Sequence, residues 1–288
     1  MSISREELYV RDMRTLVSVL ICGLLSLSHS STPKRPNIVM IIADDLGYQD
    51  VGFRGSNIRT PNIDRLAREG VILENHYVMS VCAPTRASLM TGRHAIRTGF
   101  WKGNLNTVEK FGLGLDETLL PEMLKRNGYS THGVGKWHCG AYSWEHTPAK
   151  RGFDTFFGLF LGGQYYFSHR ESVNEWLDFR ENYHDAKGNF IDDIRDDLDG
   201  LYNTYLFTNK SVELIRNHDK TRPLFLECRI PISHVINIGI DVSSLLQKWA
   251  VNEGNPSNSS FQKRTFTSSQ RKIAALAGKS YTVIRCEY

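Results

Sequence analysis

The sequence has little excess charge of either sign. Lys and Arg number 35 and Asp and Glu number 31, which gives a formal net charge of +4. From Val235 onward there are 7 basic and 3 acidic residues, so the whole excess lies in the last part of the chain. A charge this small and this local does not provide a nucleic-acid-binding surface, and we expect no nucleic-acid partner. The 288 residues, 41% of them hydrophobic, are enough for a substantial core.

Cysteine is also scarce. Five cysteines occur, at wide and irregular spacings: Cys22, Cys82, Cys139, Cys228 and Cys286. These spacings fit neither a disulfide framework nor a zinc ribbon. The pattern therefore leaves open a chemical role for at least one cysteine.

The chain lacks an N-terminal apolar run of the length that spans a membrane. Leu16 to Leu27 is apolar, but a span needs about 20 such residues. Basic residues precede this run and small residues follow it, which is typical of a secretory signal peptide cleaved near Ser30; a signal anchor is the alternative. We therefore expect residues 1–30 to be a signal peptide, with no stable membrane span and a lysosomal or extracellular destination. Asn209 and Asn258 begin glycosylation acceptor tripeptides.

Strand-like and helix-like segments alternate after this region. Ile38 to Ala43 is a continuous apolar run bounded by turn residues, as in a strand buried on both faces. Further extended segments are expected at Val71–Val78, Tyr129–Val134 and Leu224–Leu226. Helices are expected at Asn62–Gly70, at Glu117–Asn127 and along a face formed by Leu201, Tyr205, Val212 and Ile215. This alternation predicts an α/β fold, a sheet with helices on both faces.

The composition changes twice along the chain. A proline-marked linker occupies residues 31–36, and the α/β pattern covers residues 37–234. From residue 235 to 288, Ser, Asn, Lys and Gln dominate, and only Tyr281 to Ile284 could form another strand. We therefore expect one domain at 37–234, followed by a divergent and poorly ordered tail.

The most specific motif begins at Cys82. It reads Cys82-Ala83-Pro84-Thr85-Arg86 and continues through Leu89 to Gly92-Arg93. C-x-P-[ST]-R followed by L-x-T-G-R resembles the signature of the type I sulfatases, in particular the arylsulfatase B, I and J branch. The resemblance implies an alkaline-phosphatase-like fold and oxidation of Cys82 to formylglycine by the formylglycine-generating enzyme. Without it, Cys82 would be read as a small buried hydrophobic residue.

The implied chemistry is the hydrolysis of a sulfate ester. A hydrated aldehyde offers one hydroxyl for attack on sulfur and a second for release of sulfate, which divides a difficult hydrolysis into two steps. The resemblance places Arg86, one helical turn after Cys82, beside the modified residue. A solvated helix arginine is the alternative.

Two adjacent carboxylates, Asp44 and Asp45, follow the first strand. Ligand sites in α/β sheets lie at the carboxyl ends of strands, and neighbouring carboxylates repel unless a cation or hydrogen bonds compensate. The pair could also cap a turn or a helix. The resemblance implies that Asp44, Asp45 and the modified Cys82 hold Ca²⁺.

Three further residues complete the implied site. Val134-Gly135-Lys136-Trp137-His138 matches a sulfatase segment, and on extended chain Lys136 and His138 would point the same way. The resemblance implies that both bind sulfate oxygens or assist the nucleophile and leaving group. It also places His234 where it donates to the leaving oxygen, although the residues after it depart from the family pattern.

The resemblance covers about Pro36 to His234 and implies sulfated glycosaminoglycan or another sulfate ester as substrate. A phosphate or phosphonate monoester hydrolase with the same nucleophile is an alternative, and a non-catalytic secreted fragment that binds sulfated glycan is another. The D-N-G segment that supplies further metal ligands in sulfatases is not found in the sequence. We therefore expect the 288-residue chain, taken alone, to hydrolyse sulfate esters poorly.

Overall fold

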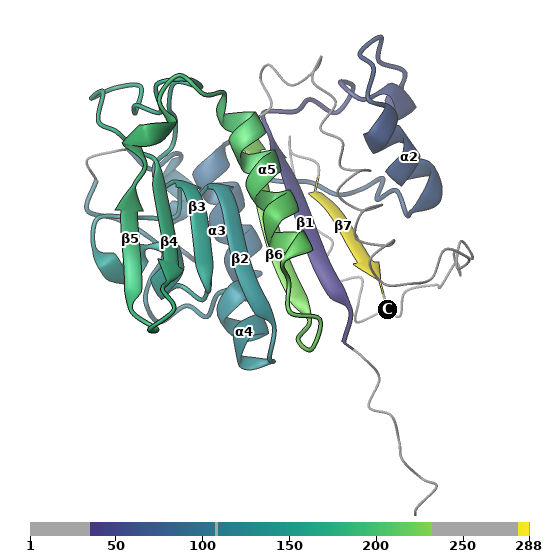
Figure 1. The fold of residues 1–288 in the computed structure, drawn as a ribbon. Coiled ribbons are helices and arrows are strands. Elements are labelled where there is room, and N and C mark those ends of the chain that lie inside the picture. Colours follow the sequence, from purple (N-terminus) through teal and green to yellow (C-terminus); the bar gives the residue numbers. More distant parts are fainter. Residues whose placement is uncertain (1–34, 107–108, 232–281, 288) are drawn as a thin grey trace, which may run out of the picture. The chain divides into compact units, whose positions relative to one another are not determined.

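Parallel strands form the centre of the structure (Figure 1). The computed structural model describes residues 35–106, 109–231 and 282–287. Within them, the strands form a seven-stranded sheet in the order β5-β4-β3-β2-β6-β1-β7. Their bounds are β1 Asn37–Asp44, β2 Ser130–Lys136, β3 Thr155–Leu159, β4 Arg180–His184, β5 Phe190–Ile194, β6 Leu224–Pro231 and β7 Thr282–Glu287. Strands β1, β6, β2 and β3 are parallel, whereas β4, β5 and β7 join antiparallel.

Helices cover both faces of this sheet, as the sequence predicts. Helix α5 lies on one face and α3 and α4 lie on the other (Figure 1). The bounds are α2 Pro61–Glu69, α3 Cys82–Thr91, α4 Leu120–Arg126 and α5 Asn203–Arg216. Short 3-10 helices occur at Gly52–Arg54, Phe100–Lys102, Trp144–His146, Pro148–Lys150 and Asp196–Leu198.

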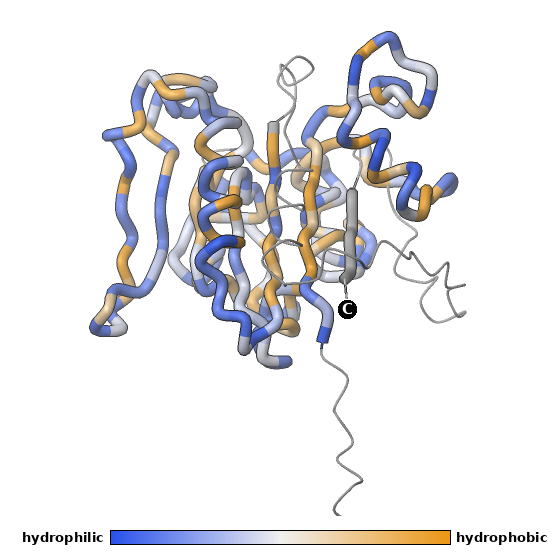
Figure 2. The backbone as a smooth tube through the Cα atoms, turned by 45° about the vertical axis from the view of Figure 1, so that its right-hand side comes forward, coloured by the Kyte–Doolittle hydropathy of each residue, from blue (hydrophilic) through white to orange (hydrophobic). Residues whose placement is uncertain are grey.

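Side chains of β6 alternate between two apolar clusters. Leu224, Leu226 and Cys228 pack with Phe207 of α5, whereas Phe225 packs into the cluster on the α3 side. A strand covered on both faces needs apolar residues at successive positions, which explains the continuous apolar runs of β1 and β6. Figure 2 shows this concentration of hydrophobic residues along the central strands.

Several expected elements are confirmed and others are wrong. The strands near Ile38, Tyr129 and Leu224 are present as β1, β2 and β6, and residues 282–287 form β7. Val71–Val78 is not a strand: Val71, Ile72 and Leu73 are 65%, 40% and 47% exposed. A continuous apolar run suits a strand that is buried on both faces, as β1 is, whereas most of this segment is open to solvent.

The two later helices also differ from their expected form. Helix α4 begins at Leu120, not at Glu117, because Pro121 suits a first helical turn and the Glu122 carboxylate accepts the Leu119 N–H. Helix α5 is present, but Leu201 and Tyr205, expected on its apolar face, are about half exposed. Ile215 is buried and Val212 is partly buried against the core, as expected, and the rest of the buried face is formed by Asn203, Thr204, Phe207 and Ser211. Small polar residues on this face hid it from a search for apolar periodicity.

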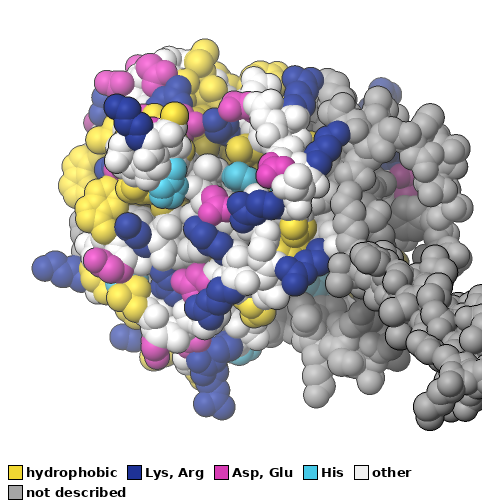
Figure 3. All heavy atoms as spheres, turned by 60° about the horizontal axis from the view of Figure 1, so that its bottom comes forward, with side chains coloured by type: hydrophobic (Ala, Val, Ile, Leu, Met, Phe, Trp, Pro, Cys, Tyr) yellow, Lys and Arg dark blue, Asp and Glu magenta, His cyan; other side chains and the backbone are white. Residues whose placement is uncertain are grey.

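The remaining expectations concern residues outside the described part. The signal peptide, His234, Asn258 and most of the tail lie there. In the described part of the chain, no helix combines the length and apolar character needed to cross a bilayer. On the face seen in Figure 3, basic side chains are scattered among acidic and neutral ones rather than gathered into one patch.

Candidate active site

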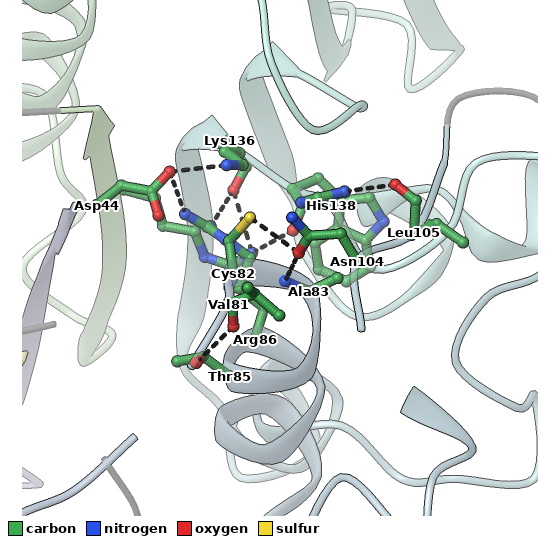
Figure 4. Close-up of polar contacts among 12 residues, drawn as sticks. Asp44, Val81, Cys82, Ala83, Thr85, Arg86, Asn104, Leu105, Lys136 and His138 are labelled. Atoms are coloured by element: carbon green, nitrogen blue, oxygen red, sulfur yellow. Dashed lines mark hydrogen bonds and ion pairs between the residues drawn. The ribbon is translucent and has the colours of Figure 1, made fainter. Parts of the chain in front are cut away.

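Three predicted site residues meet at one edge of the sheet. Asp44 is the last residue of β1, Lys136 is the last residue of β2, and Cys82 is the first residue of α3. Both strands run parallel to β6, which lies between them, so their carboxyl ends reach the same edge. Figure 4 shows Asp44, Lys136 and Cys82 around the start of α3.

A buried cluster of charges forms the floor of this site. Lys136 Nζ lies 2.8 Å from Asp44 Oδ2, and an Arg86 guanidinium nitrogen lies 3.4 Å from the same oxygen. All three side chains are buried. Burial alone would raise the pKa of Asp44, but the charges of Arg86 and Lys136 outweigh burial and lower this pKa to about 2. Asp44 is therefore ionised, and two cations share one carboxylate.

Backbone contacts fix the end of β2 that carries Lys136. Arg86 donates to the Lys136 carbonyl at 2.5 Å, and Arg229 of β6 donates to the carbonyls of Lys136 and Trp137 at 3.3 and 3.0 Å. Gly135 has φ +96°, and a Cβ there would lie 1.8 Å from the Arg229 carbonyl oxygen. Only glycine fits this close approach of β2 to β6.

Cys82 differs from the other cysteines whose side chains the structure describes. Cys139 and Cys228 are buried, and burial raises the pKa of each thiol to about 11. Cys82 is partly exposed. Its Sγ lies 3.3 Å from Asn104 Oδ1, an oxygen that also accepts the Ala83 N–H at 3.3 Å. Exposure at the site edge makes Cys82 the accessible thiol of the three.

The backbone conformation at His138 differs from the extended one that was expected. Its φ is +52°, so the chain is not extended beyond Lys136 and the simple alternation argument is wrong. The backbone N–H groups of Trp137 and His138 still bond to the carbonyls of Leu159 and Phe160, at 2.9 and 3.1 Å. His138 Nε2 lies 3.0 Å from the Leu105 carbonyl oxygen, which draws the ring toward the loop before residue 107 (Figure 4).

The protonation of His138 follows from these contacts. Burial, together with the charges of Lys136 and Arg86, lowers its pKa to about 3, so the imidazole is neutral. The Leu105 carbonyl can only accept a hydrogen bond, so Nε2 carries the proton. Nδ1 is then an acceptor, and it is buried with no hydrogen-bond partner among the described residues.

The two aspartates expected to share a cation diverge. Asp44 is buried, whereas Asp45 is exposed with φ +64°. Among the described residues, no group of three His, Cys, Asp or Glu side chains is placed to hold a metal. Ca²⁺ binds oxygen ligands, which include carboxylates, and it takes about 6–8 oxygens in all. The aspartates thus have the right chemistry for part of a calcium shell.

Asn104 was not identified from the sequence. It lies in an irregular loop 22 residues after Cys82 and belongs to no periodic pattern. Only the fold brings its amide to the start of α3. Arg229 was likewise missed, since it and Glu227 follow the apolar run Leu224–Leu226 from which this strand was predicted.

The comparison with known proteins agrees with this arrangement. The sulfatase family model matches residues 36–235, and the chain belongs to the sulfatase family. It is 42% identical over 196 residues to arylsulfatase J of Mus musculus, a match that covers 67% of this chain and 31% of the relative. It is 34% identical over 230 residues to N-acetylgalactosamine-6-sulfatase of Mus musculus, covering 75% and 43%. The chain thus spans less than half the length of these relatives.

Solved structures show the same fold. Ps i-CgsB in complex with k-i-k-neocarrahexaose is 32% identical, with a TM-score of 0.60 over 70% of this chain and 46% of that one. BT4656 in complex with its substrate D-glucosamine-2-N,6-O-disulfate is 28% identical, with a TM-score of 0.50 over 68% and 34%. The sulfatase PsFucS1 from Pseudoalteromonas sp., at 24% identity and a TM-score of 0.61, supports the fold. The sulfatase fold and the arylsulfatase resemblance are therefore confirmed.

Proposed function

We propose that this chain carries the nucleophile and the anion-binding half of a sulfuric ester hydrolase site. The observation that carries the proposal is the position of Cys82. It is partly exposed at the start of α3, where Arg86 and Lys136 converge on Asp44 at the sheet edge. The substrate class that we propose is a sulfated glycosaminoglycan or another sulfate ester, which includes aryl sulfates.

Cys82 is proposed to be converted to formylglycine, which in its hydrated form supplies a hydroxyl nucleophile and a second hydroxyl for release of sulfate. The chain around it is suited to that group, because the side chain is accessible and has a hydrogen-bond acceptor at 3.3 Å. Arg86, one turn later on α3, holds positive charge beneath this position. This conversion would require the formylglycine-generating enzyme as a partner. We therefore also propose that the protein enters the secretory pathway and is lysosomal or extracellular.

Lys136 and Arg86 are proposed to stabilise the negative charge that grows on sulfate oxygens. Both are held rigidly by the buried Asp44 carboxylate, so little reorganisation is needed when the anion arrives. Their two charges against the one of Asp44 leave the cluster with a net positive charge. His138 is neutral and its Nδ1 has no partner among the described residues, and this atom is proposed to assist the nucleophile or the leaving group by accepting a hydrogen bond.

Asp44 and Asp45, together with the modified Cys82, are proposed to hold Ca²⁺. When bound, the cation would supply positive charge that polarises an oxygen of the sulfate group. His234, outside the described residues, is proposed to donate to the leaving oxygen. The roles of these residues rest on their correspondence with the sulfatase motifs and on the chemistry of their side chains.

The test is sulfate release. The protein is produced with the formylglycine-generating enzyme, both as the 288-residue chain and extended by the second half of a related sulfatase. Turnover of an aryl sulfate with calcium is expected from the extended form and is expected to disappear in Cys82→Ala. Equal turnover by Cys82→Ala would contradict the proposal. Binding of sulfated glycan by both forms without any turnover would favour a binding protein instead.

A further inference from the structure

The start of α3 is held by a side chain from a distant part of the sequence. The residue before the helix, Val81, has no side-chain oxygen that could cap it. Pro84 has no N–H, and the Thr85 N–H already bonds to the Val81 carbonyl. The Ala83 N–H therefore needs an external acceptor, and Asn104 Oδ1 supplies it at 3.3 Å.

The same oxygen accepts the thiol of Cys82 at 3.3 Å. An exposed side chain in the first turn of a helix can otherwise exchange among rotamers, because few neighbours restrict it. The orientation of the Asn104 amide follows from the Ala83 contact, since a backbone N–H must face the oxygen and not the NH₂ group. The bond to Cys82 therefore selects one orientation of the Cys82 side chain.

The next residue of this loop contacts another part of the site. The Leu105 carbonyl accepts His138 Nε2–H at 3.0 Å, and the Leu105 side chain packs against the core on the α3 side. Asn104 thus contacts the proposed nucleophile at position 82, and the next residue, Leu105, contacts His138 (Figure 4). The Leu105 contact holds the backbone next to Asn104, and the exposed Asn104 amide is held at the start of α3 by its own contacts with Cys82 and Ala83.

We propose that Asn104 is a positioning residue for the side chain at position 82. Its Oδ1 holds the thiol in the unmodified protein, and it accepts a hydrogen bond from a hydroxyl at this position in the modified protein. The second half of this statement rests on the proposed function. The first half concerns the thiol alone and can be tested without any sulfatase activity.

The thiol test uses protein made in cells that lack the formylglycine-generating enzyme. Alkylation of Cys82 by iodoacetamide is followed by peptide mass spectrometry, so that each cysteine is measured separately. Loss of one neutral hydrogen bond corresponds to about a two- to tenfold change, and we expect Asn104→Ala to raise the alkylation rate by that factor. The control is Asn106→Ala: Asn106 is an exposed asparagine in the same loop whose amide bonds to Glu109, and its loss should leave the rate unchanged.

Asn104→Asp separates positioning from simple capping. Aspartate keeps the acceptor for the Ala83 N–H, so the helix start is preserved, but its charge disfavours the Cys82 thiolate. We expect alkylation slower than in the parent protein. If Asn104 Oδ1 does not hold the thiol, both variants alkylate at the parental rate well below their unfolding temperatures, and that result would overturn the proposal. Should Asn104→Ala fail to fold, the Asn104→Asp rate decides alone.

A second measurement addresses the converted protein. An aminooxy probe reacts with the aldehyde of formylglycine and not with its hydrate. If Asn104 accepts a hydrogen bond from the hydrate, Asn104→Ala shifts the equilibrium toward the aldehyde and speeds oxime formation. Unchanged labelling would overturn this half of the proposal. Absence of any aldehyde in the parent protein would instead count against formylglycine at Cys82 and leave the thiol result standing.

Discussion

The buried ion pair behind the site permits a quantitative prediction. Arg229 and Glu227 stand two residues apart on β6 with 2.7 Å between nitrogen and oxygen, and their side chains are 3% and 1% exposed. The Arg229 guanidinium also lies 5.3 Å from the centre of the Trp137 ring. The perturbation is Arg229→Met, which keeps most of the side-chain volume and removes the charge and the donors.

The expected loss has two parts. Removing one partner of a buried pair leaves an uncompensated charge, which costs about 3–5 kcal/mol. The carbonyl of Trp137 also loses a donor, whereas that of Lys136 keeps Arg86. A buried acceptor left without its donor costs about 1–3 kcal/mol. The double variant Glu227→Leu/Arg229→Met removes the first part and keeps the second, so it should be more stable than Arg229→Met by a few kcal/mol.

The pH dependence follows from Glu227. Burial raises its pKa even with Arg229 present, and loss of Arg229 removes the charge that opposes this rise. A carboxyl whose pKa is raised in the folded state takes up a proton on folding above its unfolded pKa, so stability falls as the pH rises. Arg229→Met should therefore lose more stability at pH 8 than at pH 5, and the double variant should not show this slope.

Urea unfolding at both pH values, followed by tryptophan fluorescence, measures these differences. Both variants lack the hydrogen bond from Arg229 to the Trp137 carbonyl, so its cost cancels when their free energies of unfolding are compared. Equal stability of the two variants at pH 8 would refute the reasoning, since it would mean that the Glu227 carboxylate does not depend on Arg229. A slope that survives in the double variant would assign the pH dependence to another group.

Further predictions concern maturation, backbone fit and a second carboxylate. In a secretory host, tryptic peptide mass spectrometry should find formylglycine at Cys82, and unmodified thiol despite excess modifying enzyme would contradict this. N-terminal sequencing of the secreted chain should begin near residue 31, with glycan on Asn209, which is exposed on α5; retention of the apolar N-terminal run would favour a membrane anchor. The Gly135→Ala variant should unfold at a much lower urea concentration than the Gly188→Ala variant. Both glycines have positive φ, but a Cβ at Gly135 would lie 1.8 Å from a β6 carbonyl oxygen, whereas a Cβ at Gly188 would meet nothing within 4 Å. Burial raises the pKa of Asp178 to about 6, although two backbone hydrogen bonds to its carboxylate oppose this rise. The free energy of unfolding should therefore fall between pH 4 and pH 6, where the native state holds a proton that the unfolded state has lost. Asp178→Asn should remove this pH dependence in urea titrations, and an unchanged slope would exclude Asp178 as its source.

The sequence was sufficient for the central strands β1, β2 and β6, which are buried on both faces, whereas β3, β4 and β5 were not predicted. Their continuous apolar runs, as in β1 and β6, identify them without any alignment. The site residues at strand ends and at the start of α3 followed from the motif around Cys82 and from Asp44 and Lys136. These positions depend on local pattern, which one sequence shows directly.

Other features depend on contacts between distant segments. His138 has a left-handed backbone and an N–H bond to the Phe160 carbonyl, and no local pattern shows either feature. Asn104 and Arg229 act through the fold, and each looks unremarkable within its own segment. The buried face of α5 was predicted only in part: Ile215 lies on it, but the buried Thr204 and Ser211 are small polar residues. Hydropathy alone does not distinguish such residues from exposed ones.

The strand order has a consequence for synthesis. Strand β6 lies between β1 and β2, so neither can complete its pairing until residues 224–231 leave the ribosome. Translation proceeds at about 5–20 residues per second, so the time between synthesis of the end of β1 and synthesis of the start of β6 is on the order of ten to forty seconds. The surface that receives α3 includes Phe225 and is incomplete during that time. The segment around Cys82 thus leaves the ribosome well before its docking site exists. Under the proposed maturation of Cys82, an enzyme that acts on extended chain would have this delay in which to reach it.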